Sequence, residues 1–73
     1  MSTLDLIINR YGLLLTLDQV GQLFHRSPAA IRQALARHAG IGVELQGAAV
    51  KKGRRLYFRA ADVAKVIDDG EQQ

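Results

Sequence analysis

The sequence predicts a small α+β fold that is mainly helical and carries one small β-hairpin. Two observations predict the helices: apolar residues recur at helical spacing, and Ser, Thr and Pro stand where helix N-termini are expected. A third predicts the hairpin: residues 49–58, AVKKGRRLYF, hold two short apolar arms around a basic stretch with a glycine. A chain of 73 residues is long enough for a single domain, residues 1–73, with a modest core.

The first predicted helix covers residues 2–11. Ser2 or Thr3 can cap its N-terminus, and Gly12 ends it. One face carries an apolar stripe at helical spacing, formed by Leu4, Ile7, Ile8 and Tyr11. This stripe is either part of the core or a homodimer contact. Residues 13–15 are three leucines, which favour a short extended segment or a buried connector.

Residues 17–39 predict two short helices joined by a tight turn. The first runs from about residue 17 to 24, and Thr16 with Gln19 matches a capping box at its start. Its inner face is formed by Val20, Leu23 and Phe24. Gly21 costs about 1 kcal/mol of helix propensity relative to alanine. We therefore expect the second helix to approach closely at Gly21.

The second helix of this unit is expected over residues 28–39, after a turn at 25–27. Ser27 can cap it, and Pro28 suits its first position because no N–H is needed there. Gly40 follows as a C-terminal cap. A helical step of about 100° per residue predicts one buried face. That face is formed by Ile31, Ala34, Leu35 and His38.

The opposite face of this helix has the chemistry of a DNA recognition surface. Its residues are Ala29, Gln33, Ala36 and Arg37, with Arg32 on the flank and Ser27 at the N-terminus. In the major groove, arginine can bond guanine and glutamine can bond adenine. Small alanines let a helix lie close to the bases, and helix N–H groups near Ser27 can bind phosphate. The alternative is an ordinary solvated helix face.

Residues 41–49 give an ambiguous pattern, because alternating apolar residues favour a strand whereas Gly40, Gly42 and Gly47 favour a loop. In the hairpin at 49–58 the turn is expected near Lys52 and Gly53. Its basic residues are Lys51, Lys52, Arg54 and Arg55. They either bind phosphates or a minor groove, or protect an exposed strand edge. Tyr57 either contacts the DNA backbone or packs on the outer sheet face.

A closing helix is predicted over residues 60–68. Its apolar stripe is formed by Ala60, Val63, Val66 and Ile67. Asp62 suits the first turn, because carboxylates interact favourably with the positive end of the helix dipole. Asp68 and Asp69 are unfavourable at the other end. The helix is therefore expected to stop there, leaving 69–73 as a flexible tail.

Charge is strongly segregated along the chain. The net charge is +3, yet the segment 26–59 carries +7 and the remaining residues carry −4. A basic centre between acidic ends is the pattern expected of a protein whose one face meets a polyanion.

The order of three segments, LLTLDQVGQLFHRSPAAIRQAL, GRRLYF and RAADVAKVID, resembles the small excisionase-like and MerR-type DNA-binding domains. The resemblance covers residues 13–68. It implies a winged helix-turn-helix, in which the basic hairpin is the wing. The roles it implies are transcription regulation or control of site-specific DNA recombination, in bacteria, phages or plasmids. Residues 41–49 depart from the commoner compact connector of that superfamily.

Other classes of function find little support in the sequence. The chain has no cysteine, and His25 and His38 are not at metal-ligand spacing, so neither a metal nor a cofactor is expected. We find no nucleophile motif, phosphate loop or carboxylate pair, so an enzyme is not expected. No apolar run is long enough for a membrane span and no signal peptide is recognisable, which favours the cytoplasm, with nucleoid association when bound.

The sequence therefore predicts a sequence-specific double-stranded DNA-binding protein. Its role would be that of a small transcriptional regulator or an excisionase-like recombination directionality factor of a mobile element. Such a role implies a homodimer or cooperative oligomer on DNA, and contact with a recombinase or RNA polymerase. The alternative is a protein-interaction module with a degenerate helix-turn-helix, whose N-terminal helix dimerises or binds a partner. RNA binding is less favoured because the few aromatic residues form no stacking platform.

Overall fold

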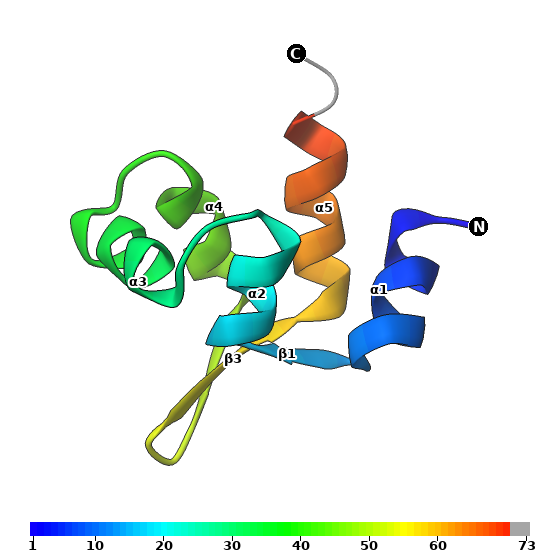
Figure 1. The fold of residues 1–73 in the computed structure, drawn as a ribbon, viewed down its shortest axis with the longest axis horizontal. Coiled ribbons are helices and arrows are strands. Elements are labelled where there is room, and N and C mark those ends of the chain that lie inside the picture. The colour runs from blue at the N-terminus through cyan, green and yellow to red at the C-terminus, as the bar shows by residue number, and fades with distance from the viewer. Residues whose placement is uncertain (71–73) are drawn as a thin grey trace.

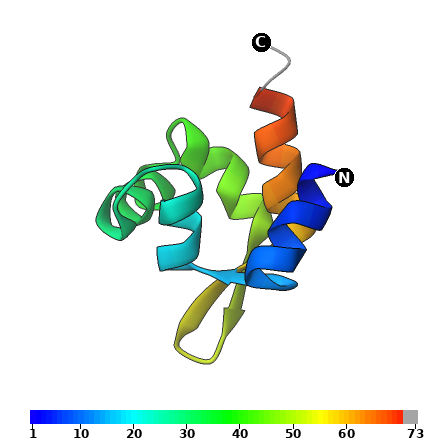
Figure 2. The same cartoon turned by 45° about the vertical axis from the view of Figure 1, so that its right-hand side comes forward.

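Five helices and a three-stranded antiparallel sheet make up the computed structural model, which describes residues 1–70 (Figure 1). The elements are α1 (Thr3–Tyr11), β1 (Leu14–Thr16), α2 (Leu17–Leu23), α3 (Pro28–Arg37), α4 (Ile41–Ala48), β2 (Ala49–Lys52), β3 (Arg55–Arg59) and α5 (Ala60–Gly70). The molecule is flattened, with extents of 32 × 31 × 19 Å. The β2–β3 hairpin projects away from the helices in both views (Figures 1 and 2).

Three side-chain caps fix the starts of α1, α2 and α3. The Ser2 and Thr16 caps are reciprocal: the Gln19 N–H donates to Thr16 Oγ1 (3.2 Å), and Gln19 Oε1 accepts from the Thr16 N–H (2.9 Å). The Ala30 N–H donates to Ser27 Oγ at 3.1 Å, with Pro28 in the first turn. All three expected helix starts are therefore confirmed, with Ser2 rather than Thr3 capping α1.

The turn between α2 and α3 is tight, and two residues make it so. His25 has φ 58°, in the left-handed region that histidine tolerates better than most residues. A Cβ at Gly21 would lie 2.6 Å from the carbonyl oxygen of Arg26. The expected close approach at Gly21 is thus confirmed, although the turn backbone approaches it rather than the body of α3.

The C-terminal end of α3 differs from the sequence prediction. The helix ends at Arg37 instead of residue 39, and His38 rather than Gly40 is its left-handed cap, with φ 50°. His38 is exposed, so its assignment to the buried face was wrong. The prediction for His38 extended the helical periodicity beyond Arg37, where α3 ends. Gly40 is instead the N-cap residue of the next helix, α4.

Residues 41–48 form a helix, α4, where the sequence suggested a strand or a loop. One of its glycines, Gly42, has a packing role that the sequence pattern does not reveal. A Cβ at Gly42 would overlap the carbonyl group of Ala34, so α3 and α4 cross with their backbones in contact. The side chain of Gln46 strengthens this crossing by donating to the carbonyl oxygen of Leu35 at 3.0 Å. Tertiary packing therefore overrides the weak local helix signal.

The sheet has the order β1-β3-β2, so the central strand β3 lies between two short edge strands. β1 confirms the extended segment expected after α1. The hairpin is also confirmed, with Lys52 paired to Arg55 and a two-residue turn at Gly53 and Arg54, one residue later than expected. Phe58 pairs with Leu15 on one side and Ala49 on the other.

The closing helix α5 is longer than predicted. It continues through Asp68 and Asp69 to Gly70, so residues 69 and 70 are helical rather than part of a tail. Thr3 Oγ1 donates to Asp68 Oδ1 at 2.7 Å, which gives this carboxylate a partner on α1. The rest of the predicted tail, 71–73, lies outside the described residues.

The core lies where the sheet meets the helices. Its fully buried large side chains are Leu15, Val20, Ile31, Leu45, Phe58 and Val63. Ile7 of α1 is also buried, and the other members of the α1 stripe, Leu4, Ile8 and Tyr11, pack against this core. α1 lies against α5 (Figure 2), so its apolar stripe is used within the chain.

Candidate nucleic-acid interface

The outer face of α3 carries the predicted recognition residues. Ile31 and Leu35 are buried, whereas all six predicted recognition residues are exposed: Ser27, Ala29, Arg32, Gln33, Ala36 and Arg37. The helix therefore presents two arginines and a glutamine to solvent, together with the small side chains of Ala29 and Ala36. The helical periodicity was sufficient to predict this face, because α3 is regular from Pro28 to Arg37.

The N-terminus of α3 has little hydrogen-bonding capacity left. Pro28 has no N–H, Ala30 donates to Ser27 Oγ, and the Ile31 N–H donates to the Ser27 carbonyl oxygen at 3.1 Å. Within residues 1–70, the Ala29 N–H is left as the free donor of the first turn. Arg26 is exposed just before the cap, so a phosphate at this end would meet one N–H group and one guanidinium group.

The tip of the hairpin concentrates positive charge. We use the name basic tip for its four exposed cationic residues, Lys51, Lys52, Arg54 and Arg55. Lys52 and Arg55 are paired across the strands, an arrangement in which like charges destabilise a hairpin. No carboxylate among residues 1–70 forms an ion pair with the basic tip. A bound polyanion would relieve this repulsion.

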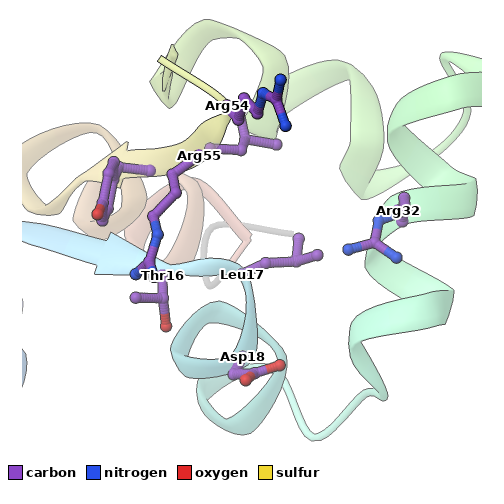
Figure 3. Close-up of a pocket in the computed structure, with 8 residues that line it drawn as sticks. Thr16, Leu17, Asp18, Arg32, Arg54 and Arg55 are labelled. Carbon is purple, nitrogen blue, oxygen red and sulfur yellow. The ribbon is translucent and has the colours of Figure 1, made fainter. Parts of the chain in front are cut away.

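A groove of about 520 Å³ lies between α3 and the hairpin. Its lining residues are Thr16, Leu17, Asp18, Arg32, Arg54, Arg55, Leu56 and Tyr57. Figure 3 shows the guanidinium group of Arg32 reaching from α3 into this groove, while Arg55 extends along the opposite side toward Thr16. Three arginines from two separate elements thus line one concave surface, against a single carboxylate.

The structure therefore brings together only some of the predicted site residues. Arg32, Arg54, Arg55 and Tyr57 share the groove, whereas Lys51 and Lys52 do not line it. The remaining α3 residues belong to the exposed face of that helix. Tyr57 is half-buried beside Thr16 and Val50 in the sheet, so it both packs on the sheet and contributes to the groove.

Sequence reasoning missed the contribution of α2 to this surface. Thr16, Leu17 and Asp18 line the groove because the start of α2 lies across from Arg54 of the hairpin (Figure 3). Asp18 also lines a second hollow, together with Arg26 and His25. The sequence does offer a signal for Arg26 as a site residue, because Arg26 begins the basic segment 26–59. The position of Asp18 depends on how α2 packs, which no local pattern reports.

Asp18 places a negative charge beside cationic residues, because it lines both the groove that holds Arg32, Arg54 and Arg55 and the hollow that holds Arg26. If this surface meets phosphates, Asp18→Asn should raise the affinity for duplex DNA of any sequence about threefold, because one repulsive interaction is lost. Asp69→Asn removes the same charge from exposed α5 and is the matched control. Fluorescence anisotropy with a labelled duplex measures both. Equal gains from the two variants would mean that only net charge matters.

Comparisons with known proteins give no relative for this chain. No protein family matches the sequence, and neither a curated protein nor a solved structure shows significant similarity to it. None of the helices formed by residues 1–70 has the length and hydrophobicity of a membrane span. The same residues contain no cluster of three or more His, Cys, Asp or Glu side chains that could hold a metal ion.

Proposed function

We propose that this chain binds double-stranded DNA as a winged helix-turn-helix protein. In this proposal α3 is the recognition helix and enters the major groove, and the β2–β3 hairpin is the wing. The observation that carries the proposal is the shared groove, in which Arg32 of α3 faces Arg54 and Arg55 of the hairpin. A recognition helix beside a basic hairpin can contact bases and backbone at the same time.

Each part of the surface has a separate task in this proposal. Arg32, Gln33 and Arg37 read base edges, and the methyl groups of Ala29 and Ala36 allow close approach and contact with thymine. The basic tip binds phosphates or enters an adjacent minor groove. The Ala29 N–H and Arg26 bind a phosphate at the N-terminus of α3. The start of α2 lies over the backbone between these contacts.

The biological role that we propose follows from the sequence resemblance. The chain would occupy or bend a DNA site, either to regulate transcription or to direct a recombinase on a mobile element. Cooperative assembly on DNA, and contact with a recombinase or RNA polymerase, belong to the same proposal. A neighbouring integrase gene would favour the recombination role, and a divergent promoter would favour transcription regulation.

Titration with duplex DNA at several salt concentrations tests the proposal. Contacts to about five phosphates would give a slope near −4.5 in a plot of log K against log salt concentration, because each contact releases counterions. Binding weaker than about 10⁻⁴ M at low salt, or binding insensitive to salt, would contradict it.

Base reading by α3 is tested by substitution at its exposed positions. Arg32→Ala or Gln33→Ala should reduce discrimination between the preferred site and a scrambled duplex by about 1–3 kcal/mol, because one bidentate base contact is lost. Both side chains are exposed, so we expect little change in stability. A selection from random duplexes supplies the preferred site. An equal loss of affinity for both duplexes would show that the residue contacts phosphate instead.

A further inference from the structure

A second surface lies on the side of the molecule away from the projecting hairpin. An open hollow of about 600 Å³ is lined by residues from the end of α2, the start of α4 and the second half of α5. Figure 1 shows where these three elements lie relative to the hairpin. Most of its lining is apolar and half-buried: Leu23, Phe24, Ile41, Val66 and Ile67. These side chains pack against the core from one side and face solvent on the other. Contiguous apolar surface of this kind is typical of protein interaction sites.

One edge of this hollow is acidic. Glu44 lines it and also lines an adjoining depression that includes Asp62, Lys65 and Asp69. Asp62 is paired with Arg59 at 3.1 Å. Glu44 and Asp69 are exposed, and neither forms an ion pair within the described part of the chain. Lys65 offsets one of these two charges, so the edge keeps a net negative charge of one in a protein whose net charge is positive.

We propose that this hollow binds an amphipathic, basic α-helix of a different protein. The apolar face of that helix would cover Leu23, Phe24 and Ile67, and its lysine or arginine side chains would lie over Glu44 and Asp69. A groove between helices is a common receptor for the apolar face of another helix. The acidic edge specifies cationic flanking residues, because opposite charges across an interface favour the correct partner.

A second copy of this chain fits the hollow less well. Most of its exposed cations lie on α3 and the basic tip, and neither element has an exposed large apolar side chain. Exposed large apolar side chains occur elsewhere, at Met1, Leu6, Leu13, Leu14 and Val43, but Arg10 is the one basic residue among residues 1–14, so that segment offers a single cation to the acidic edge. The apolar stripe of α1 packs against the core of its own chain. The inference goes beyond the proposed function and does not depend on it: the hollow and the DNA-facing groove share no lining residue.

Two synthetic helical peptides test this inference. Both carry the same leucine stripe, and the remaining positions are lysine in one and glutamate in the other. We expect the lysine peptide to shift the backbone amide NMR signals of the full-length protein around the hollow. Glu44→Lys should weaken this binding about fivefold, because an attraction becomes a repulsion at an exposed site. Asp18→Lys makes the same change of charge at the other surface and should leave the affinity unchanged.

Several results would overturn the inference. One is the absence of binding by the lysine peptide, and another is a set of shifted signals that lies elsewhere on the protein. Equal binding of both peptides at the hollow would show that the acidic edge does not select a basic helix. Shifts of the hollow signals on raising the protein concentration alone would identify a second copy as the occupant. The NMR spectrum of each variant shows directly that it is folded.

Discussion

Replacing Gly42 by alanine is expected to lower the free energy of unfolding by about 3 kcal/mol, near the upper end for an overpacked site. The added methyl group would overlap the Ala34 carbonyl, so α3 and α4 would have to separate. Separation would also break the bond from Gln46 to the Leu35 carbonyl. A domain of this size has a total stability of only about 3–5 kcal/mol, so much of the variant should be unfolded.

Gly47→Ala is the matched control for this prediction. Gly47 lies in the same helix, and an added methyl group there has no neighbour within 4 Å. Alanine should therefore stabilise the protein by about 0.5–1 kcal/mol through helix propensity and reduced unfolded-state entropy. Urea denaturation followed by circular dichroism measures both variants. A Gly42→Ala protein as stable as wild type would show that α3 and α4 do not cross so closely.

If the chain binds DNA as proposed, the largest expected effect on that binding comes from the basic tip. Lys52→Ala combined with Arg55→Ala should weaken binding about 50-fold at about 0.1 M salt and reduce the salt slope by about 2, because two phosphate contacts are lost. The loss should be similar for specific and nonspecific duplexes, since phosphates carry no sequence information. Stability should be retained or slightly increased, because the substitutions remove the like-charged cross-strand pair.

Arg10→Ala combined with Lys65→Ala is the control for this pair. It removes the same charge from exposed positions on α1 and α5, outside the basic segment. Its effect on DNA affinity should be a few-fold at most, because charges farther than about 10 Å from the ligand are screened at that salt concentration. If the control substitutions weaken DNA binding as much as the tip substitutions do, the hairpin does not contact DNA as a wing.

Signals within a few residues of each other predicted most of the helix starts. Thr16 with Gln19, and Ser27 with Pro28, specify hydrogen bonds that form inside one helical turn. The contacts between the two arms of the hairpin are also short in sequence, since only two residues separate Lys52 from its partner Arg55. These elements could be predicted because their stabilising contacts are short in sequence.

α4 could not be predicted because its stability comes from tertiary contacts. Its N-cap, Gly40, makes no side-chain hydrogen bond, and its glycines suggest a loop. What holds it is the backbone contact between Gly42 and Ala34 and the burial of Leu45. The end of α3 was misplaced for a related reason: His38 adopts the left-handed cap where glycine was expected.

The candidate site divides in the same way. The exposed face of α3 followed from periodicity, and the basic tip from composition. The groove did not follow, because it depends on the packing of the hairpin and α2 around α3. Asp18, which is 14 residues from Arg32 in the sequence, is therefore visible as part of the surface only in the fold.

A map of backbone amide NMR shifts on addition of duplex DNA tests the central claim most directly. The DNA-binding proposal predicts the largest changes on the exposed side of α3, at the basic tip and at the start of α2, with little change on α1 and the second half of α5. We also expect these shift changes to disappear at high salt, because salt weakens binding to phosphates. Largest changes on α1 or α5, or no change with DNA in excess at low salt, would contradict the proposal.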